Sequence, residues 1–190
     1  MIRRVLLVGA GGHAKVLNDM LALLGWSIAS YVDPKTANWL NCTRYESDDA
    51  ALEDRLNDSF AIGMGGMTPQ ALESRSLLAG RYAAFKAAPA VIDPRAIVST
   101  SARVSDSAQV FVGSVVNADA YLGEASIVNT CAIVEHEASI GAGTHVAPGA
   151  IVLGGATVGN FCMIGAGAIV LPGVRVPDRT LVAAGSVFRK

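Results

Sequence analysis

Residues 146–170 read VAPGAIVLGGATVGNFCMIGAGAIV, and every sixth residue of this stretch, from Val146 to Val170, is aliphatic. A second, small residue stands four positions after each of these, with Val174 as the one larger member. The aliphatic position continues outward in both directions without a gap, from Ile92 to Val182. Neither an α-helix nor an alternating strand has a period of six residues. The second half of the chain is therefore an internal repeat.

A triangular parallel coil explains this period. Each six-residue unit forms a short strand and a corner, and three units complete one turn of the coil. The aliphatic residue points inward, and the small residue also points inward close to a corner. Backbone hydrogen bonds join successive turns as in a parallel sheet. The repeat from Ile92 to Val182 predicts about five such turns.

Composition excludes several classes of protein. The chain has 190 residues, of which 52% are hydrophobic and 16% charged, so it is too apolar for intrinsic disorder. A net charge of −1 provides no basic field for nucleic acid, and no apolar run reaches the ~18 residues of a membrane span. The three cysteines are an odd number without metal-ligand spacing, which favours a reduced, cytoplasmic protein.

The first half predicts a small α/β unit, and we place the boundary so that residues 1–85 form this unit and residues 86–190 the coil. Strands are expected at 3–9, 28–32 and 60–63. Helices are expected at 16–24 and at about 69–79. Strands that alternate with helices indicate a parallel sheet.

A glycine-rich segment follows the first expected strand. Gly9, Gly11 and Ala14 match the spacing of a dinucleotide fingerprint, with Asp33 near its acidic position. Glycines let backbone N–H groups approach a phosphate at a helix N-terminus. The alternative is a tight strand-to-helix turn without a ligand. A full NAD site is disfavoured, because this α/β region is little more than half of a complete dinucleotide-binding fold.

The coil together with the segment Gly-Ala-Gly-Gly-His-Ala-Lys at residues 9–15 resembles the bacterial sugar O- and N-acetyltransferases with hexapeptide repeats. That group includes sialic acid O-acetyltransferases and N-acetyltransferases of UDP- or GDP-linked 4-amino sugars. The resemblance implies a left-handed coil, acetyl-CoA as donor, no metal, and a homotrimer with active sites between subunits. Carbonic anhydrases of the gamma type share the coil but use three zinc-binding histidines, and only two histidines lie in the coil here.

The resemblance also assigns binding residues. Gly11, Gly12 and His13 would contact the nucleotide sugar, Asp33 would read its base, and Gly63 would line the same pocket. Backbone along the C-terminal turns of the coil would meet CoA at three positions, which are Gly154, Ala166 and Ala184.

The histidines carry the expected chemistry. His136 lies between the inward residues Val134 and Ala138, so it sits near a corner and can project outward. Amide formation needs a base to remove a proton from the attacking amine, and histidine suits this role. Glu137, or with less support Glu135, would orient the ring. The alternative is a surface histidine paired with a glutamate.

His145 precedes an inward residue and should face outward on a flat side of the coil. The resemblance places it at the thioester end of acetyl-CoA, and Asn129 would help to hold the acceptor.

The sequence thus predicts direct acetyl transfer to the amine of a nucleotide-linked 4-amino-4,6-dideoxy sugar, in the biosynthesis of a bacterial surface glycan. O-acetylation of sialic acid or another sugar hydroxyl is the alternative within enzymes. A binding or scaffold protein that kept the coil and lost catalysis is the alternative of another class.

Overall fold

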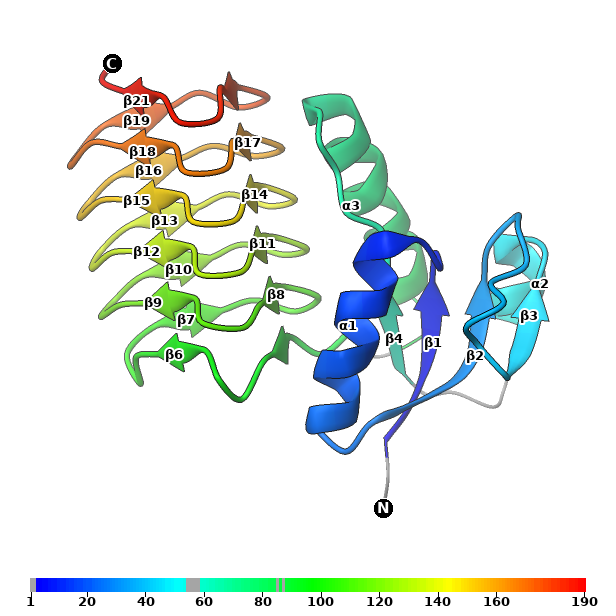
Figure 1. Cartoon of the computed structure of the whole chain (residues 1–190). Coiled ribbons are helices and arrows are strands. Elements are labelled where there is room, and N and C mark those ends of the chain that lie inside the picture. The colour runs from blue at the N-terminus through cyan, green and yellow to red at the C-terminus, as the bar shows by residue number, and fades with distance from the viewer. Residues whose placement is uncertain (1–2, 54–58, 85, 87) are drawn as a thin grey trace.

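The computed structural model describes residues 3–53, 59–84, 86 and 88–190 (Figure 1). The N-terminal part is an α/β unit with four parallel strands in the order β3-β2-β1-β4. Its strands are β1 (Arg4–Val8), β2 (Ser27–Val32), β3 (Thr43–Tyr45) and β4 (Ser59–Ile62). Its helices are α1 (Gly12–Leu23), α2 (Asp48–Leu52) and α3 (Pro69–Ala83).

Local sequence explains most of these elements. In α1 the buried side chains of Met20 and Leu21 follow that of Leu17 by three and four residues, about one turn, and the chain leaves the helix at Gly25, whose φ is +71°. In α3 the Thr68 hydroxyl accepts from the backbone N–H of Ala71, and Pro69 occupies the first turn. The expected helices are confirmed but longer: the first already begins at Gly12, and the second runs on to Ala83. The short β3 and α2 carry no pattern that predicted them.

The six-residue period is confirmed over the whole second half. Seventeen strands of two residues each, β5 to β21, form three parallel sheets. Their bounds are β5 (Val91–Ile92), β6 (Ile97–Val98), β7 (Arg103–Val104), β8 (Gln109–Val110), β9 (Val115–Val116), β10 (Tyr121–Leu122), β11 (Ile127–Val128), β12 (Ile133–Val134), β13 (Ser139–Ile140), β14 (His145–Val146), β15 (Ile151–Val152), β16 (Thr157–Val158), β17 (Met163–Ile164), β18 (Ile169–Val170), β19 (Arg175–Val176), β20 (Leu181–Val182) and β21 (Val187–Phe188).

The inside of the coil is filled as the repeat predicts. The aliphatic positions from Val110 to Val182 form one buried cluster with small residues such as Ala132, Ala150 and Ala168, and none of these side chains is more than 3% exposed. Successive turns are joined by backbone bonds such as Ile133 N–H to Ala150 O, at 2.9 Å. The corners also repeat: a residue with positive φ recurs every six positions, and half of these are glycines. Tight corners therefore account for much of the glycine content.

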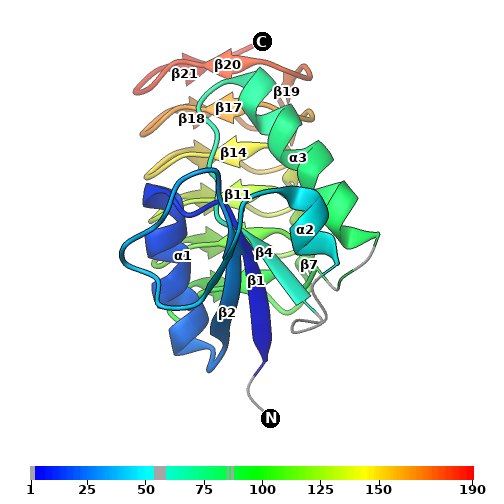
Figure 2. The ribbon, with the colours of Figure 1, turned by 90° about the vertical axis from the view of Figure 1, so that its right-hand side faces the viewer.

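The three sheets have different outer faces. We call β5, β8, β11, β14, β17 and β20 the docked face, because its residues Val91, Phe111 and Ile127 pack into one cluster with α1 and β1. Figures 1 and 2 show α1 and α3 lying against this side of the coil. We call β6, β9, β12, β15, β18 and β21 the apolar face. Its outward residues are Ile97, Val115, Ile133, Ile151, Ile169 and Val187.

The third sheet, β7, β10, β13, β16 and β19, is the polar face, with Arg103, Tyr121, Ser139, Thr157 and Arg175 outward. Among the described helices, none has the length and apolar character that crossing a bilayer requires.

Candidate active site

The glycine-rich segment connects β1 to α1. Gly9 has a φ of +86°, and its N–H donates to the carbonyl of Val32 at 2.8 Å. A side chain at Gly63 would place its Cβ 2.1 Å from the Gly9 carbonyl oxygen, so the two strand ends approach too closely for any other residue. This close approach explains why residue 63 is a glycine. The contact of Gly63 with the substrate stays a prediction.

An open hollow of about 530 Å³ lies at the N-terminus of α1. Gly11 caps the helix without a side-chain bond, and a Cβ added at Gly11 or Gly12 would meet open space. Lys15 and Trp39 line the same hollow, and the Trp39 indole N–H donates to the Ala10 carbonyl at 3.1 Å. Unpaired helix N–H groups beside a lysine suit an anion such as a phosphate. The sequence predicted the two glycines here but not Trp39.

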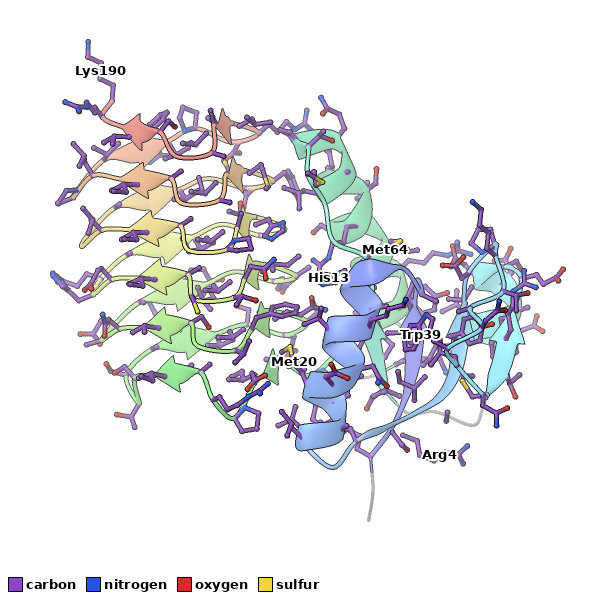
Figure 3. The ribbon with its side chains drawn as sticks, viewed as in Figure 1. Arg4, His13, Met20, Trp39, Met64 and Lys190 are labelled. Atoms are coloured by element: carbon purple, nitrogen blue, oxygen red, sulfur yellow. The ribbon has the colours of Figure 1, made fainter. Side chains whose placement is uncertain are left out.

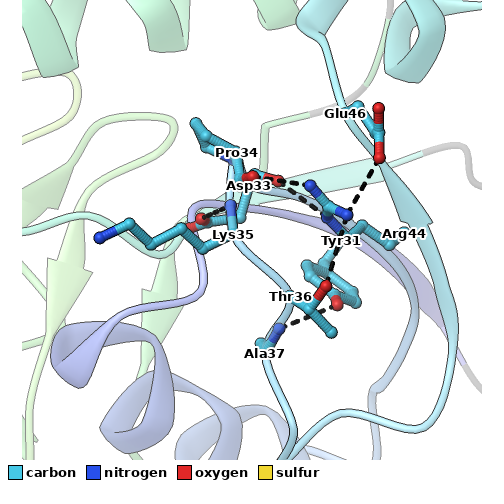
Figure 4. A network of polar contacts seen from close by, with 8 residues as sticks. All are labelled: Tyr31, Asp33, Pro34, Lys35, Thr36, Ala37, Arg44 and Glu46. Carbon is cyan, nitrogen blue, oxygen red and sulfur yellow. Dashed lines mark hydrogen bonds and ion pairs between the residues drawn. The ribbon is translucent and has the colours of Figure 1, made fainter.

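Asp33 stands at the end of β2 and faces the glycine-rich segment (Figure 4). One carboxylate oxygen accepts from the N–H of Ala10 at 2.9 Å, and the other from the N–H of Lys35 at 2.8 Å. The side chain of Arg44 donates to the carbonyls of Asp33 and Pro34. Asp33 thus ties the strand tip to the glycine-rich segment, and its predicted contact with a base would add to these bonds.

His13 belongs to the first turn of α1, and its side chain lies between this helix and the coil (Figure 3). Its Nε2 is 2.8 Å from Oε1 of Gln109 on β8, and the Gln109 amide N–H donates to the Ile62 carbonyl. Because Gln109 gives its N–H to Ile62, its oxygen faces His13, and Nε2 of His13 carries the proton. Burial, together with the nearby Arg75 and His145, lowers the pKa of His13 to about 4, although the hydrogen bond to Gln109 acts to raise it. The ring is neutral at pH 7.

Arg75 of α3 links the α/β unit to the coil. Its side chain is 1% exposed, Nε donates to the Met64 carbonyl at 2.7 Å, and Nη1 donates to the Ala125 carbonyl. Burial lowers the pKa of Arg75 to about 10. Among the described residues Nη2 has no hydrogen-bond partner. No pattern in the sequence distinguished this arginine from the exposed arginines of the chain.

His145 is on the docked face and points away from the coil, as predicted, but the α/β unit covers it and leaves it 6% exposed. Nδ1 is 2.8 Å from the Gly66 carbonyl, and Nε2 is 2.9 Å from the amide of Asn129. Burial lowers the pKa of His145, and the nearby Arg75 lowers it as well. The structure therefore brings His145 and Asn129 together, beside the loop at residues 63–66.

His136 lies elsewhere, at the corner between the apolar and the polar face. We call this corner, with the turns at 135–138 and 153–156, the far edge. His136 is 61% exposed, and its Nδ1 is 3.2 Å from a carboxylate oxygen of Glu137, which is 70% exposed. A carboxylate oxygen of Glu135 accepts from the backbone N–H of His136. His136 therefore pairs with Glu137 as expected, and the role of this pair in catalysis stays a prediction.

The predicted CoA residues divide between two edges. Gly154 belongs to the far edge, where a Cβ on it would lie 2.7 Å from the His136 ring. Ala166 and Ala184 belong to the corner between the docked and the apolar face, with turns at 129–132, 147–150, 165–168 and 183–186, which we call the near edge. Asn129 is on the near edge as well. One chain therefore holds the predicted site in two parts, which lie on either side of its apolar face.

Comparisons with known proteins identify the family. The model of the PglD N-terminal domain matches residues 4–69. A mutant of GDP-perosamine N-acetyl transferase from Caulobacter crescentus, solved in complex with CoA and GDP-perosamine, is 31% identical over 100% of this chain and 90% of that chain, with a TM-score of 0.89. This chain belongs to the same family. It is an acetyl-CoA-dependent acetyltransferase built on a left-handed β-helix.

A second relative agrees. The acetyltransferase domain of PglB from Neisseria gonorrhoeae FA1090, in complex with acetyl coenzyme A, is 28% identical over 100% of this chain and 92% of that chain, with a TM-score of 0.89. WeeI from Acinetobacter baumannii AYE, at 15% identity and a TM-score of 0.53, shares the fold. No curated protein matches the chain by sequence. Within the described residues, no group of three or more His, Cys, Asp or Glu side chains is placed to hold a metal.

Proposed function

We propose that this enzyme transfers the acetyl group of acetyl-CoA to the amine of a nucleotide-linked 4-amino-4,6-dideoxy sugar, in the biosynthesis of a bacterial surface glycan. The observation that supports it most is the likeness over the full chain to GDP-perosamine N-acetyl transferase, a mutant of which was solved with CoA and GDP-perosamine. The hollow at Gly11, Gly12 and Lys15 suits the diphosphate of such a substrate. Trp39 lines the same hollow and Asp33 is bonded to its lining residue Ala10, so both would contact the base.

His136 would act as the general base. The amine nitrogen attacks the thioester carbon, and its proton passes to the imidazole while CoA leaves as the thiolate. The bond between Nδ1 and the Glu137 carboxylate would hold the ring with Nε2 free to accept this proton. No covalent enzyme intermediate is needed.

The working enzyme would be a homotrimer. The outward residues of the apolar face form a continuous aliphatic ladder from Ile97 to Val187, and such a ladder is typical of a surface that another subunit covers. The ladder is bounded by the far edge with His136 and the near edge with Asn129. His145 follows His136 by nine residues, half a turn, so the two histidines differ by only about 2.4 Å along the coil axis at a strand spacing of about 4.8 Å. A neighbouring copy could therefore bring His136 to the half-site at His145.

The first experiment measures thiol release from acetyl-CoA with a panel of UDP- and GDP-linked 4-amino-4,6-dideoxy sugars. We expect release with one of them and none with the corresponding 4-hydroxy sugars. Release only with hydroxyl acceptors such as sialic acid would favour O-acetylation instead. Stabilisation of the fold by neither acetyl-CoA nor nucleotide sugars would favour a scaffold.

The shared site has its own test, which mixes two inactive variants. His136→Ala and Asn129→Ala subunits are co-expressed with different tags and purified as mixed trimers. If each site takes its histidine from one subunit and its asparagine from the next, about a third of the sites in the purified mixed trimers are intact. Activity that stays at the level of the single variants would contradict a site between subunits.

A further inference from the structure

Three polar contacts in a row connect the α/β unit to the near edge of the coil. The Gly66 carbonyl is 2.8 Å from Nδ1 of His145, Nε2 of His145 is 2.9 Å from Nδ2 of Asn129, and Oδ1 of Asn129 is 2.8 Å from the N–H of Thr130. Both ends of this row are backbone groups. A carbonyl can only accept and an N–H can only donate, so the ends fix the direction of every bond between them.

The Thr130 N–H requires the oxygen of the Asn129 amide, so the amide nitrogen faces His145 and donates to Nε2. The Gly66 carbonyl requires a proton on Nδ1 of His145. His145 is thus a neutral ring with Nδ1–H and an unprotonated Nε2. His13 has the opposite arrangement, with its proton on Nε2.

The surroundings maintain this arrangement. A second proton on His145 would point at the N–H of Asn129, leaving two donors face to face. The ring is buried, and the guanidinium of Arg75 on α3 and the neutral His13 on α1 both lie close enough to interact with it electrostatically. Arg75 also holds the Met64 carbonyl and so anchors the loop that carries Gly66.

Asn129 has one amide hydrogen left. Nδ2 gives one N–H to His145, and no described residue accepts the other. The residues stacked at the same corner position in the following turns are Ala147, Gly165 and Ala183, whose side chains are too short to cover the half-buried amide. An oriented N–H donor is therefore open on the edge where Ala166 and Ala184 are expected to meet CoA.

We propose that Asn129 donates this N–H to the thioester oxygen on which negative charge develops during acetyl transfer, and that His145 positions Asn129 without touching the thioester. The inference rests on the proposed function and changes the role expected for His145. A neutral ring with Nδ1 committed to Gly66 has no proton on Nε2 to offer an oxyanion, whereas the amide has one.

Acetyl transfer forms one C–N bond and breaks one C–S bond. The amine lone pair forms the C–N bond, and the carbonyl electron pair moves onto oxygen, where the Asn129 N–H stabilises it. The amine proton passes to His136. When the carbonyl forms again, the C–S bond breaks and CoA leaves as the thiolate.

A double-mutant cycle tests the coupling. We expect Asn129→Ala to lower kcat by about 10²–10³-fold, the usual effect of removing one oxyanion donor, with the KM of the sugar little changed. His145→Ala should lower kcat less, and the double variant should lose no more than Asn129→Ala alone. Losses that multiply in the double variant, or a raised sugar KM at unchanged kcat, would overturn the proposal.

Conservative variants sharpen the cycle. His145→Gln can keep an acceptor at the Nε2 position for Asn129, whereas His145→Asn can keep only the bond to Gly66, so we expect the glutamine variant to retain more kcat. The reverse order would overturn the positioning role. Thermal unfolding of each variant checks that the junction between the two parts still forms.

A readout that needs no acceptor separates this inference from the proposed function. In protein labelled with ¹⁵N-histidine, we expect His145 to show a protonated Nδ1 and His13 a protonated Nε2, both neutral at the ordinary histidine pKa of about 6.5. His136 serves as the exposed reference. A protonated Nε2 on His145 would overturn the proposal even if the enzyme is active. The expected tautomer, together with no acetylation of any amino sugar, would count against the proposed function alone.

Discussion

The junction between the α/β unit and the coil differs from the far edge in almost every physical respect. At the junction, His13, His145 and Arg75 are largely withdrawn from water and held by bonds to backbone or amide groups. At the far edge, His136 and Glu137 stand mostly in solvent and contact mainly each other. Both regions carry residues that the sequence assigned to one active site.

The difference teaches how the site is divided. Burial at the junction fixes protonation and orientation within a single chain, since a buried polar group must find its partners there. An exposed histidine has no such constraint, and its environment is completed only when something covers it. We infer that the buried half is preorganised, and we propose that a neighbouring subunit covers the far edge and completes the site.

The largest effect on activity is expected from substitutions at the far edge. His136→Ala should lower kcat by about 10²–10⁴-fold, because the attacking amine loses its base. Stability should change by no more than about 0.5 kcal/mol, since the side chain is mostly exposed. Glu137→Gln should also lower kcat, whereas Glu135→Gln is the matched control and should leave it within a few-fold. Steady-state thiol release measures all three, and full turnover by His136→Ala would exclude the general-base role.

The next largest effect is a loss of folding stability when the junction is disrupted. Arg75→Met should destabilise the fold by about 2–3 kcal/mol, because the carbonyls of Met64 and Ala125 lose their buried donor. Arg81→Met on the same helix is the control: Arg81 is half exposed and pairs with Asp48 and Asp49, so its loss should cost at most about 1 kcal/mol. Urea unfolding measures both. Equal losses would mean that Arg75 does not join the two parts.

A change of pH sharpens the comparison. The pKa of His13 is about 4 in the folded chain against the ordinary histidine value of 6.5, so the unfolded chain binds the extra proton first as pH falls. Folding stability should therefore decrease below pH 6.5, by about 2 kcal/mol between pH 7 and 5. His145, whose pKa is also lowered, adds a loss of the same sign.

His13→Gln is the variant for this test, since its amide can still donate to Gln109. It should reduce the pH dependence of urea unfolding between pH 7 and 5. A wild-type curve that is flat from pH 7 to 5 would contradict a buried neutral His13.

The smallest effect on folding stability is expected at the contact between α3 and the C-terminal turns of the coil. Arg179 forms an ion pair with Glu73, and the arginine side chain is 61% exposed. Arg179→Gln should cost no more than about 1 kcal/mol, and less at high salt. Thermal melts at low and high ionic strength check this. A loss as large as that of Arg75→Met would mean that the surface pair, and not the buried arginine, joins the two parts.

Sequence reasoning succeeded where a residue's role follows from its position in a repeat. The six-residue pattern predicted the inward residues, the corners and the outward direction of His136 and His145. It failed where a role depends on what packs against a residue. Nothing in the sequence revealed that His145 is covered, that Gln109 accepts from His13, or that Arg75 is buried while Arg81 is exposed. The short β3 and α2 were missed for a different reason, because three and five residues are too few to show a period.

By itself the sequence determined the coil, the alternation of strands and helices before it, and the family resemblance, because periodicity and local motifs are properties of neighbouring residues. Only the tertiary structure decided which side of the coil receives the α/β unit, which histidines become buried and neutral, and which way the amide of Asn129 points. These properties arise between residues far apart in the chain, such as Gly66 and His145, and they depend on the removal of water from both partners at once.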